Sequence, residues 1–316
     1  MEEALLEIHN LSKKFGKHLV LDDVTFDVDN KDLLGIIGLS GSGKTTLLNI
    51  LIGFWKPTKG EILFAGGKIS RNIRAIRQLF GFATQGGSFY NKLTVRENLI
   101  YFGRLYGMNA TEIKERTDEL LSFMELEDAI DVLADNLSKG MQRRLDMACA
   151  MLHGPKVLIM DEPTEDLDPG LRKEILALIR KINQTGTTIL MTSHQLREME
   201  NICSKIAILH NGKILEVGAP DDIKTSYSKN EEILVETYPG NYNAILKKIN
   251  KRDIADVVVD KDKLVIYTPK AEKVLHDIIN SIQHLGERIV DIEVSKPSLE
   301  EVFESLTKAS KKGEKK

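Results

Sequence analysis

Gly38-Leu-Ser-Gly-Ser-Gly-Lys-Thr45 is the stretch of this sequence that decides its fold. An apolar run, Leu33–Ile37, precedes it and predicts a buried strand, and a helix-forming run, Thr46–Ile52, follows it. Glycines between a strand and a helix let backbone N–H groups gather around phosphate, and the helix N-terminus adds partial positive charge. A plain glycine- and serine-rich turn is the structural alternative, which the complete pattern in this setting disfavours. The stretch therefore predicts a loop that binds a nucleoside triphosphate.

Two residues of the loop have predicted chemical roles. Lys44 is placed to reach the β- and γ-phosphates, and the Thr45 hydroxyl to ligate Mg²⁺. The other loop residues expected around the nucleotide are Gly38, Ser40, Gly41, Ser42, Gly43 and Thr46.

A second segment, Lys156–Glu162, predicts a buried strand that ends in two carboxylates. Asp161 is expected to hold Mg²⁺ through water, opposite Thr45. Glu162 comes next, and in an extended chain its side chain points to the other side. From there it is expected to orient or polarise an attacking water as a general base.

Composition and charge limit the classes of protein to which this chain can belong. The chain has 316 residues with a net charge of −3, and it lacks the basic excess that a nucleic-acid binder usually shows. No uninterrupted apolar run reaches the roughly 18 residues of a membrane-spanning helix. The acidic N-terminus does not resemble a signal peptide. We therefore expect a cytoplasmic protein that reaches the cell membrane through a partner and does not bind nucleic acid.

The chain divides by pattern into two units. Over residues 1–218, strands alternate with helices around the phosphate loop, which predicts an α/β fold with a largely parallel sheet. The segment from Thr94 to Leu152 is predicted helical, and Thr94-Val-Arg-Glu97 has the pattern of a capping box. Three arginines, at positions 71, 74 and 77, share one face of a predicted helix, for which a solvated face is favoured over an anion site.

A polar stretch over 219–230 predicts a linker. Residues 231–307 follow the order βαββαβ, which indicates a small α+β, ferredoxin-like domain. Residues 308–316 contain five lysines and are expected to form a disordered tail, with contact to an anionic membrane surface as the lesser alternative.

Over about residues 5–218, the chain resembles the ATP-binding subunit of an ATP-binding cassette (ABC) transporter. The resemblance implies a P-loop NTPase of the ABC type, with antiparallel β and α-helical subdomains. It rests on the phosphate loop and the Lys156–Glu162 strand together with further motifs in the family's order: Lys13-Lys-Phe-Gly16, Gly81-Phe-Ala-Thr-Gln85, Leu137-Ser-Lys-Gly-Met-Gln-Arg-Arg144, Glu165-Asp-Leu-Asp168 and Thr192-Ser-His194.

The resemblance also implies roles for single residues. Phe15 matches the aromatic that stacks on adenine, and Gln85 matches the glutamine that contributes to Mg²⁺ and senses the membrane partner. His194 matches the switch histidine that contacts the γ-phosphate. Ser138 and Gly140 match the signature that contacts ATP held by the other cassette of a dimer, and Asp168 matches the loop that crosses the dimer interface.

The sequence departs from the family pattern in two places. Lys139 and Met141 stand where the signature usually has glycine and glutamine, which puts the usual contacts of that glutamine in doubt. Glu165 and Asp166 stand where small or neutral residues are common, so that five acids crowd the Asp161–Asp168 segment. Tuning of the dimer interface and a simple solvated loop are the two explanations, and the solvated loop is favoured.

The resemblance narrows to exporters of drugs, antibiotics or other hydrophobic compounds, because the signature Leu137–Met141 and the ending Pro297–Phe303 are similar to theirs. It implies an ATPase that binds ATP and Mg²⁺, pairs with a second cassette and powers export through a separate membrane permease, from the cytoplasmic face of the membrane. The alternative is an ATP-dependent regulatory or self-immunity module without transport. The role of the second unit stays open between a stabilising cap and regulation.

Overall fold

The computed structural model describes residues 4–68, 78–227, 230–260, 263–295 and 298–313. The chain divides into two compact units, Met1–Ala219 and Pro220–Lys316. The predicted helix face with the three arginines lies outside the described residues. In the described part of the chain, none of the helices combines the length and the apolar composition that a membrane span requires.

A six-stranded sheet forms the centre of the first unit. Strands β9, β3, β8, β7 and β6 run parallel, and β10 pairs antiparallel with β9. Every residue of β3, β7 and β8 is buried, as expected for parallel strands covered on both faces. The predicted, largely parallel sheet is confirmed, in the order β10 (Lys213–Gly218), β9 (Lys205–His210), β3 (Leu33–Ile37), β8 (Thr188–Ser193), β7 (Val157–Asp161) and β6 (Phe80–Ala83).

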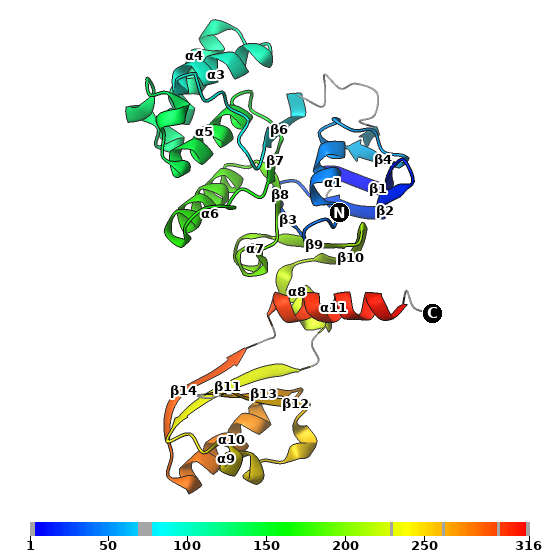
Figure 1. Ribbon diagram of the computed structural model, residues 1–316, viewed down its shortest axis with the longest axis vertical. Helices are drawn as coiled ribbons and strands as arrows, with labels where there is room; N and C mark the ends of the chain where they lie inside the picture. Colours follow the sequence, from blue (N-terminus) through cyan, green and yellow to red (C-terminus); the bar gives the residue numbers. More distant parts are fainter. Residues whose placement is uncertain (1–3, 69–77, 228–229, 261–262, 296–297, 314–316) are drawn as a thin grey trace. The chain divides into compact units, whose positions relative to one another are not determined.

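A second, antiparallel sheet packs onto the first through helix α1 (Lys44–Leu51), which contacts both β2 and β7 (Figure 1). Apolar side chains of both sheets and of α1 share one core cluster, which includes Ile8, Phe26, Leu47 and Leu190. The order of the antiparallel strands is β2 (His18–Val28), β1 (Leu6–Phe15), β4 (Lys59–Phe64) and β5 (Gly67–Lys68).

Helices fill the segment between β6 and β7. In Figure 1, helices α3, α4 and α5 form a group on the side of the parallel sheet away from the antiparallel sheet. The predicted capping box is confirmed, since Thr94 Oγ1 accepts from Glu97 N and Glu97 Oε2 accepts from Thr94 N. The α-helices among the described residues of this unit are α1, α3 (Val95–Leu105), α4 (Ala110–Met124), α5 (Lys139–Met151), α6 (Pro169–Gln184) and α7 (Leu196–Ile202).

The second unit holds a four-stranded sheet in which all pairs are antiparallel, in the order β12, β13, β11, β14. Two helices pack apolar faces onto this sheet through Ile245, Val274 and Ile278. This is the predicted ferredoxin-like arrangement. The elements are β11 (Glu231–Tyr238), α9 (Tyr242–Lys248), β12 (Asp256–Asp260), β13 (Lys263–Thr268), α10 (Ala271–Leu285) and β14 (Arg288–Ser295).

Two segments that were expected to be irregular contain helical residues. The segment 219–230, expected to be a linker, contains helix α8 (Pro220–Tyr227), and α11 (Leu299–Gly313) extends into the expected disordered tail. Pro220 followed by two aspartates suits the first turn of a helix. Helix α11 contacts α8, and its early apolar residues are buried, so packing extends helical structure beyond what composition indicates.

Candidate functional site

The phosphate loop joins the buried end of β3 to the first turn of α1. Gly43 caps the helix with φ of 109°, and a Cβ atom there would lie 2.8 Å from the Leu21 side chain. Both observations require glycine at this position. The Lys44 side chain is only 8% exposed and folds back over the loop, where Nζ donates to the carbonyl oxygens of Gly38 at 2.8 Å and Leu39 at 3.4 Å.

A cavity of about 690 Å³ opens over the loop, within the usual size range of small-molecule sites. The carboxyl ends of β7 and β8 reach it, as expected for ligand sites in parallel sheets. The described residues that line it are His18, Val20, Leu39, Ser40, Gly41, Gly43, Lys44, Thr45, Thr46, Gln85, Glu162, Glu165 and His194. The structure therefore brings most of the predicted nucleotide-site residues together, and adds four that sequence reasoning missed: His18, Val20, Leu39 and Glu165.

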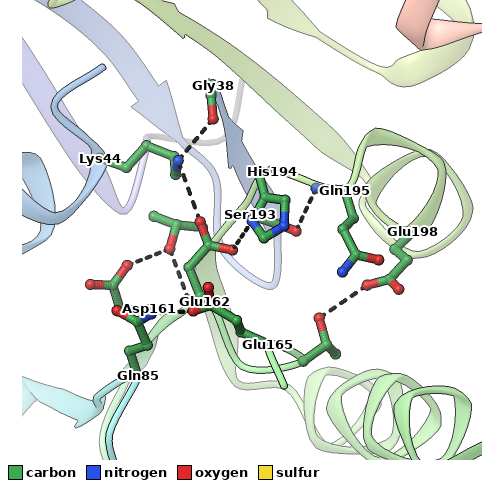
Figure 2. Close-up of polar contacts among 12 residues, drawn as sticks. Gly38, Lys44, Gln85, Asp161, Glu162, Glu165, Ser193, His194, Gln195 and Glu198 are labelled. Carbon is green, nitrogen blue, oxygen red and sulfur yellow. Dashed lines mark hydrogen bonds and ion pairs between the residues drawn. The ribbon is translucent and has the colours of Figure 1, made fainter. Parts of the chain in front are cut away.

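Glu162 contacts both Lys44 and His194 at the cavity (Figure 2). Its Oε1 lies 3.3 Å from Lys44 Nζ, and its Oε2 lies 3.0 Å from His194 Nδ1. Lys44 is 8% exposed and Glu162 12%, so water screens the contact between these two side chains only weakly. His194 follows the last residue of β8 and is about half exposed. A carboxylate, an ammonium group and an imidazole thus meet at the wall of the cavity.

The two strand-end carboxylates face different surroundings. Asp161 ends β7 and is buried, where its Oδ1 accepts from Thr192 Oγ1 at 2.6 Å. Glu162 was expected to diverge from Asp161 by the alternation of an extended strand. Instead it has φ of 49°, in the left-handed region, and its N–H donates to Thr192 Oγ1 at 3.0 Å. The divergence therefore comes from a turn held by Thr192.

Gln85 lies in the segment after β6 and meets the loop after β7. Its side-chain Nε2 donates to Glu165 Oε2. Its backbone carbonyl accepts from Arg143 Nη1 of α5 at 3.0 Å, and the Thr84 carbonyl accepts from the same nitrogen at 3.1 Å. Glu165 is half-buried and contacts Gln85, whereas Asp166 is exposed.

Seven predicted site residues are not among the described residues that line the cavity: Phe15, Gly38, Ser42, Ser138, Gly140, Asp161 and Asp168. Phe15 is 41% exposed and packs edge-on against Trp55, yet it pairs across the hairpin with His18, which does line the cavity.

Ser138, Gly140 and Asp168 have local structural roles at helix ends. Ser138 caps α5 by accepting from Met141 N, and Asp168 caps α6 by accepting from Gly170 N and Leu171 N. Gly140 lets α5 approach α6, because a Cβ there would lie 2.5 Å from the Leu171 side chain. These residues lie outside the cavity that holds Lys44.

Asp146 is a polar residue of the site region that sequence reasoning missed. It lies on α5 with no exposed surface, and its Oδ1 accepts from Ser88 N, just beyond Gln85, at 2.6 Å. Burial raises the pKa of Asp146 to about 6, although the Ser88 hydrogen bond and the nearby Arg143 charge lower it. Oδ2 has no hydrogen-bond partner among the described residues. Arg143 and Asp146 thus hold both ends of the Gln85 segment to α5.

The donor set suits a nucleotide with Mg²⁺. The hydroxyl of Thr45, the carboxylate of Asp161 and the carboxamide oxygen of Gln85 are hard oxygen ligands of the kind that Mg²⁺ takes. Beside the first turn of α1, the buried Ser42 Oγ has no hydrogen-bond partner within the described ranges. Lys44 and the helix N-terminus supply positive charge for phosphate.

A phosphate loop at the end of a parallel sheet, with strand-end carboxylates beside it, defines a P-loop nucleotide-binding protein. Comparison with known proteins narrows this class. Residues 21–165 match the family described as ABC transporter. Residues 218–307 match the family described as ATP-binding protein DrrA1-3-like, C-terminal domain.

Full-length relatives agree with these matches. The chain is 30% identical to the linearmycin resistance ATP-binding protein LnrL of Bacillus subtilis (strain 168), over 96% of this chain and 98% of that protein. It is 33% identical to the Nod factor export ATP-binding protein I of Rhizobium sp. (strain N33), over 97% of this chain and 98% of that protein. The solved structure of cbiO1 from Clostridium perfringens, part of the ABC transporter complex cbiONQ, has a TM-score of 0.66 at 25% identity, over 71% of this chain and 92% of that chain.

The chain belongs to the ABC transporter family, as an ATP-binding subunit of the exporter type with a DrrA-like C-terminal domain. ATP-binding domains of this family are ATPases that bind ATP, typically with Mg²⁺. Exporter subunits of this kind dimerise and work with membrane permeases, and peripheral association with the membrane is typical of them.

Proposed function

We propose that this chain hydrolyses ATP as one cassette of a dimer and so powers export of a hydrophobic compound through a separate membrane permease. The observation that carries the proposal is the position of Glu162 between Lys44 and His194 at the cavity wall. A carboxylate next to an ammonium group and an imidazole that can both contact phosphate is where an attacking water needs a base.

The residues divide the chemistry between them. Lys44 and the loop from Gly38 to Thr46 hold the phosphates, and Phe15 at the hairpin beside the cavity stacks on adenine. His194 contacts the γ-phosphate and is held in place by Glu162. Glu162 directs and polarises the water.

Thr45, Asp161 and Gln85 hold the metal, and Mg²⁺, when bound, neutralises phosphate charge. The Thr192 hydroxyl supports this arrangement, because it fixes the turn that separates Asp161 from Glu162.

The signature half of the site acts on a second chain. Ser138 and Gly140 lie at the N-terminus of α5, outside the cavity, so their N–H groups and helix dipole are available to ATP bound elsewhere. Asp168 belongs to the same interface. Support for export comes from the relatives, which are named for linearmycin resistance and Nod factor export. We infer that the permease selects the cargo and holds this subunit at the cytoplasmic face of the cell membrane.

The Glu162→Gln variant tests the proposal. It keeps the size of the side chain and removes the base, so ATP turnover should fall at least about 100-fold while ATP binding is kept. In Mg-ATP the variant should elute as a dimer, because hydrolysis no longer separates the two cassettes. Wild-type turnover in the variant, or a monomer in saturating Mg-ATP with the permease present, would contradict the proposal.

Purification of the Glu162→Gln form from detergent-solubilised membranes in Mg-ATP tests the transport role. A multi-helix membrane protein in near-equal amount, identified by mass spectrometry, is the expected result. Recovery of only soluble partners would leave the ATP chemistry in place and favour the regulatory or self-immunity module instead.

A further inference from the structure

Glu165 differs from the small or neutral residues that are common at this position of the family motif. It is also part of the nucleotide site, since its half-buried side chain lines the cavity together with Gln85 and Glu162. A smaller cavity of about 180 Å³, next to Arg143 of α5, also borders on Glu165 and Gln85. The carboxylate is therefore placed to act on the site.

The loop holds Glu165 in a defined position. Its N–H donates to the Glu162 carbonyl at 3.1 Å, which closes a tight turn after β7. The preceding residue, Thr164, is buried and donates from Oγ1 to Glu198 Oε2 at 3.0 Å. Glu198 in turn pairs with Arg172 Nε at 3.2 Å. Contacts at Glu165 and at the residue before it thus fix the backbone that carries this carboxylate.

The contact between Glu165 and Gln85 selects one orientation of the carboxamide. A carboxylate only accepts hydrogen bonds, so it faces the NH₂ end of the amide. The structure has this arrangement, with Gln85 Nε2 donating to Glu165 Oε2 (Figure 2). Arg143 meanwhile fixes the Gln85 backbone. The amide oxygen, Oε1, is the end left for another partner, and oxygen is the ligand that Mg²⁺ takes.

We propose that Glu165 is a positioning residue that fixes the Gln85 carboxamide with its oxygen free for the Mg²⁺ of bound ATP. Groups that hydrogen-bond to a metal ligand orient it and strengthen metal binding. The inference rests on the proposed function, because it takes Gln85 as a metal ligand. In the opposing model, the same contact withdraws Gln85 from the metal, so removal of Glu165 would strengthen metal binding.

The test compares the affinity of the full chain for trinitrophenyl-ATP in excess Mg²⁺ and in EDTA. The dissociation constant in EDTA divided by that in Mg²⁺ measures how strongly the metal and the nucleotide favour each other. This ratio is obtained without any turnover. Glu165→Ala should lower this ratio about tenfold, the low end for groups that orient a metal ligand, and leave the affinity in EDTA unchanged. Glu165→Gln keeps an acceptor oxygen for Gln85 Nε2, so its ratio should stay within about threefold of wild type.

Asp166→Asn is the matched control. It removes one negative charge from the same loop at an exposed position with φ of 59°, which asparagine tolerates, and should leave the ratio unchanged. If Asp166→Asn lowers the ratio as far as Glu165→Ala, or if Glu165→Gln does so, general loop charge explains the effect and the proposal is overturned. A ratio that is unchanged or increased in Glu165→Ala also overturns it.

Two further variants separate failure of this inference from failure of the proposed function. Gln85→Ala and Asp161→Asn should each lower the ratio, and Glu165→Ala combined with Gln85→Ala should lower it no further than Gln85→Ala alone. If the two single variants lower the ratio and Glu165→Ala does not, only the positioning role is wrong. If neither single variant lowers it, the metal site of the proposed function is wrong, and the inference fails with it.

Discussion

The phosphate loop and the signature segment both lie at the N-terminus of a helix, but their polar groups have different partners. At α1, Lys44 contacts Glu162, which contacts His194, and all three line one cavity. At α5, Ser138 caps its own helix, and Gly140 lies against a neighbouring helix, outside that cavity. The difference teaches that α1 shares one cavity with polar side chains from other elements, whereas the polar groups at the start of α5 are used within their own helix end.

Lys44→Ala should have the largest effect, because it removes the buried cation of the phosphate loop. We expect the affinity for ATP to fall roughly 100-fold or more, about 3 kcal/mol or above, as for loss of one member of a desolvated, charge-assisted contact. Titration with trinitrophenyl-ATP measures this. Lys114→Ala, at an exposed position of α4, is the control and should bind as wild type does. Retention of affinity within threefold by Lys44→Ala would show that the α1 half is not the ATP site.

Mixing two inactive variants tests whether the start of α5 acts on the nucleotide of a partner chain. Lys44→Ala disables the α1 half, and Ser138→Arg blocks the α5 half with a bulky side chain. Each alone should hydrolyse little ATP. In a two-fold dimer with shared sites, a mixed pair has one intact site, so an equal mixture should recover up to about a quarter of wild-type turnover.

Ser138→Thr, which keeps a capping hydroxyl, is the control for the helix end and should hydrolyse ATP as wild type does. If the mixture stays inactive although mixed dimers form, the signature does not act on the partner's nucleotide, and the comparison between the two helix ends loses its functional meaning.

The α1 half was largely predictable from the sequence because its signals are local. The phosphate loop, the apolar strand before it and the paired acids after Met160 each carry their own pattern. The short strand β6, with a glycine among its four residues, gives no strand signal, and α8 and the end of α11 depend on packing that composition does not reveal.

Long-range contacts in the site were less predictable still. Gln85 and Glu165 are 80 positions apart, and the family pattern does not include an acid at the second position. Arg143 and Asp146 lie in a predicted helix, yet only the folded chain shows that they hold the segment after β6. Local spacing thus predicts which groups do the chemistry, whereas the tertiary structure determines which groups orient them.

Two buried acids, Asp161 at the end of β7 and Asp146 on α5, differ in their partners. Asp161 is hydrogen-bonded to Thr192, whereas Asp146 leaves one oxygen without a partner among the described residues. Burial raises the pKa of Asp146 to about 6, so the folded chain binds this proton more tightly than the unfolded chain, where the pKa is about 4. The free energy of unfolding should therefore fall as pH rises from about 4 to about 6. It should then stay at the lower value above pH 6.

Asp146→Asn should remove this cost, because the amide is neutral and its oxygen still accepts from Ser88 N. We expect a gain at pH 8 of the order of 2 kcal/mol, or about 5 °C in Tm, the smallest of the effects considered. Thermal unfolding from pH 4 to pH 8 measures it, with Asp166→Asn as the exposed control. The variant should lose the fall in stability between pH 4 and pH 6. A Tm at pH 8 equal to or below that of wild type would mean that the charged form of Asp146 is stabilised in the fold, so that Asp146, like Asp161, has matched partners.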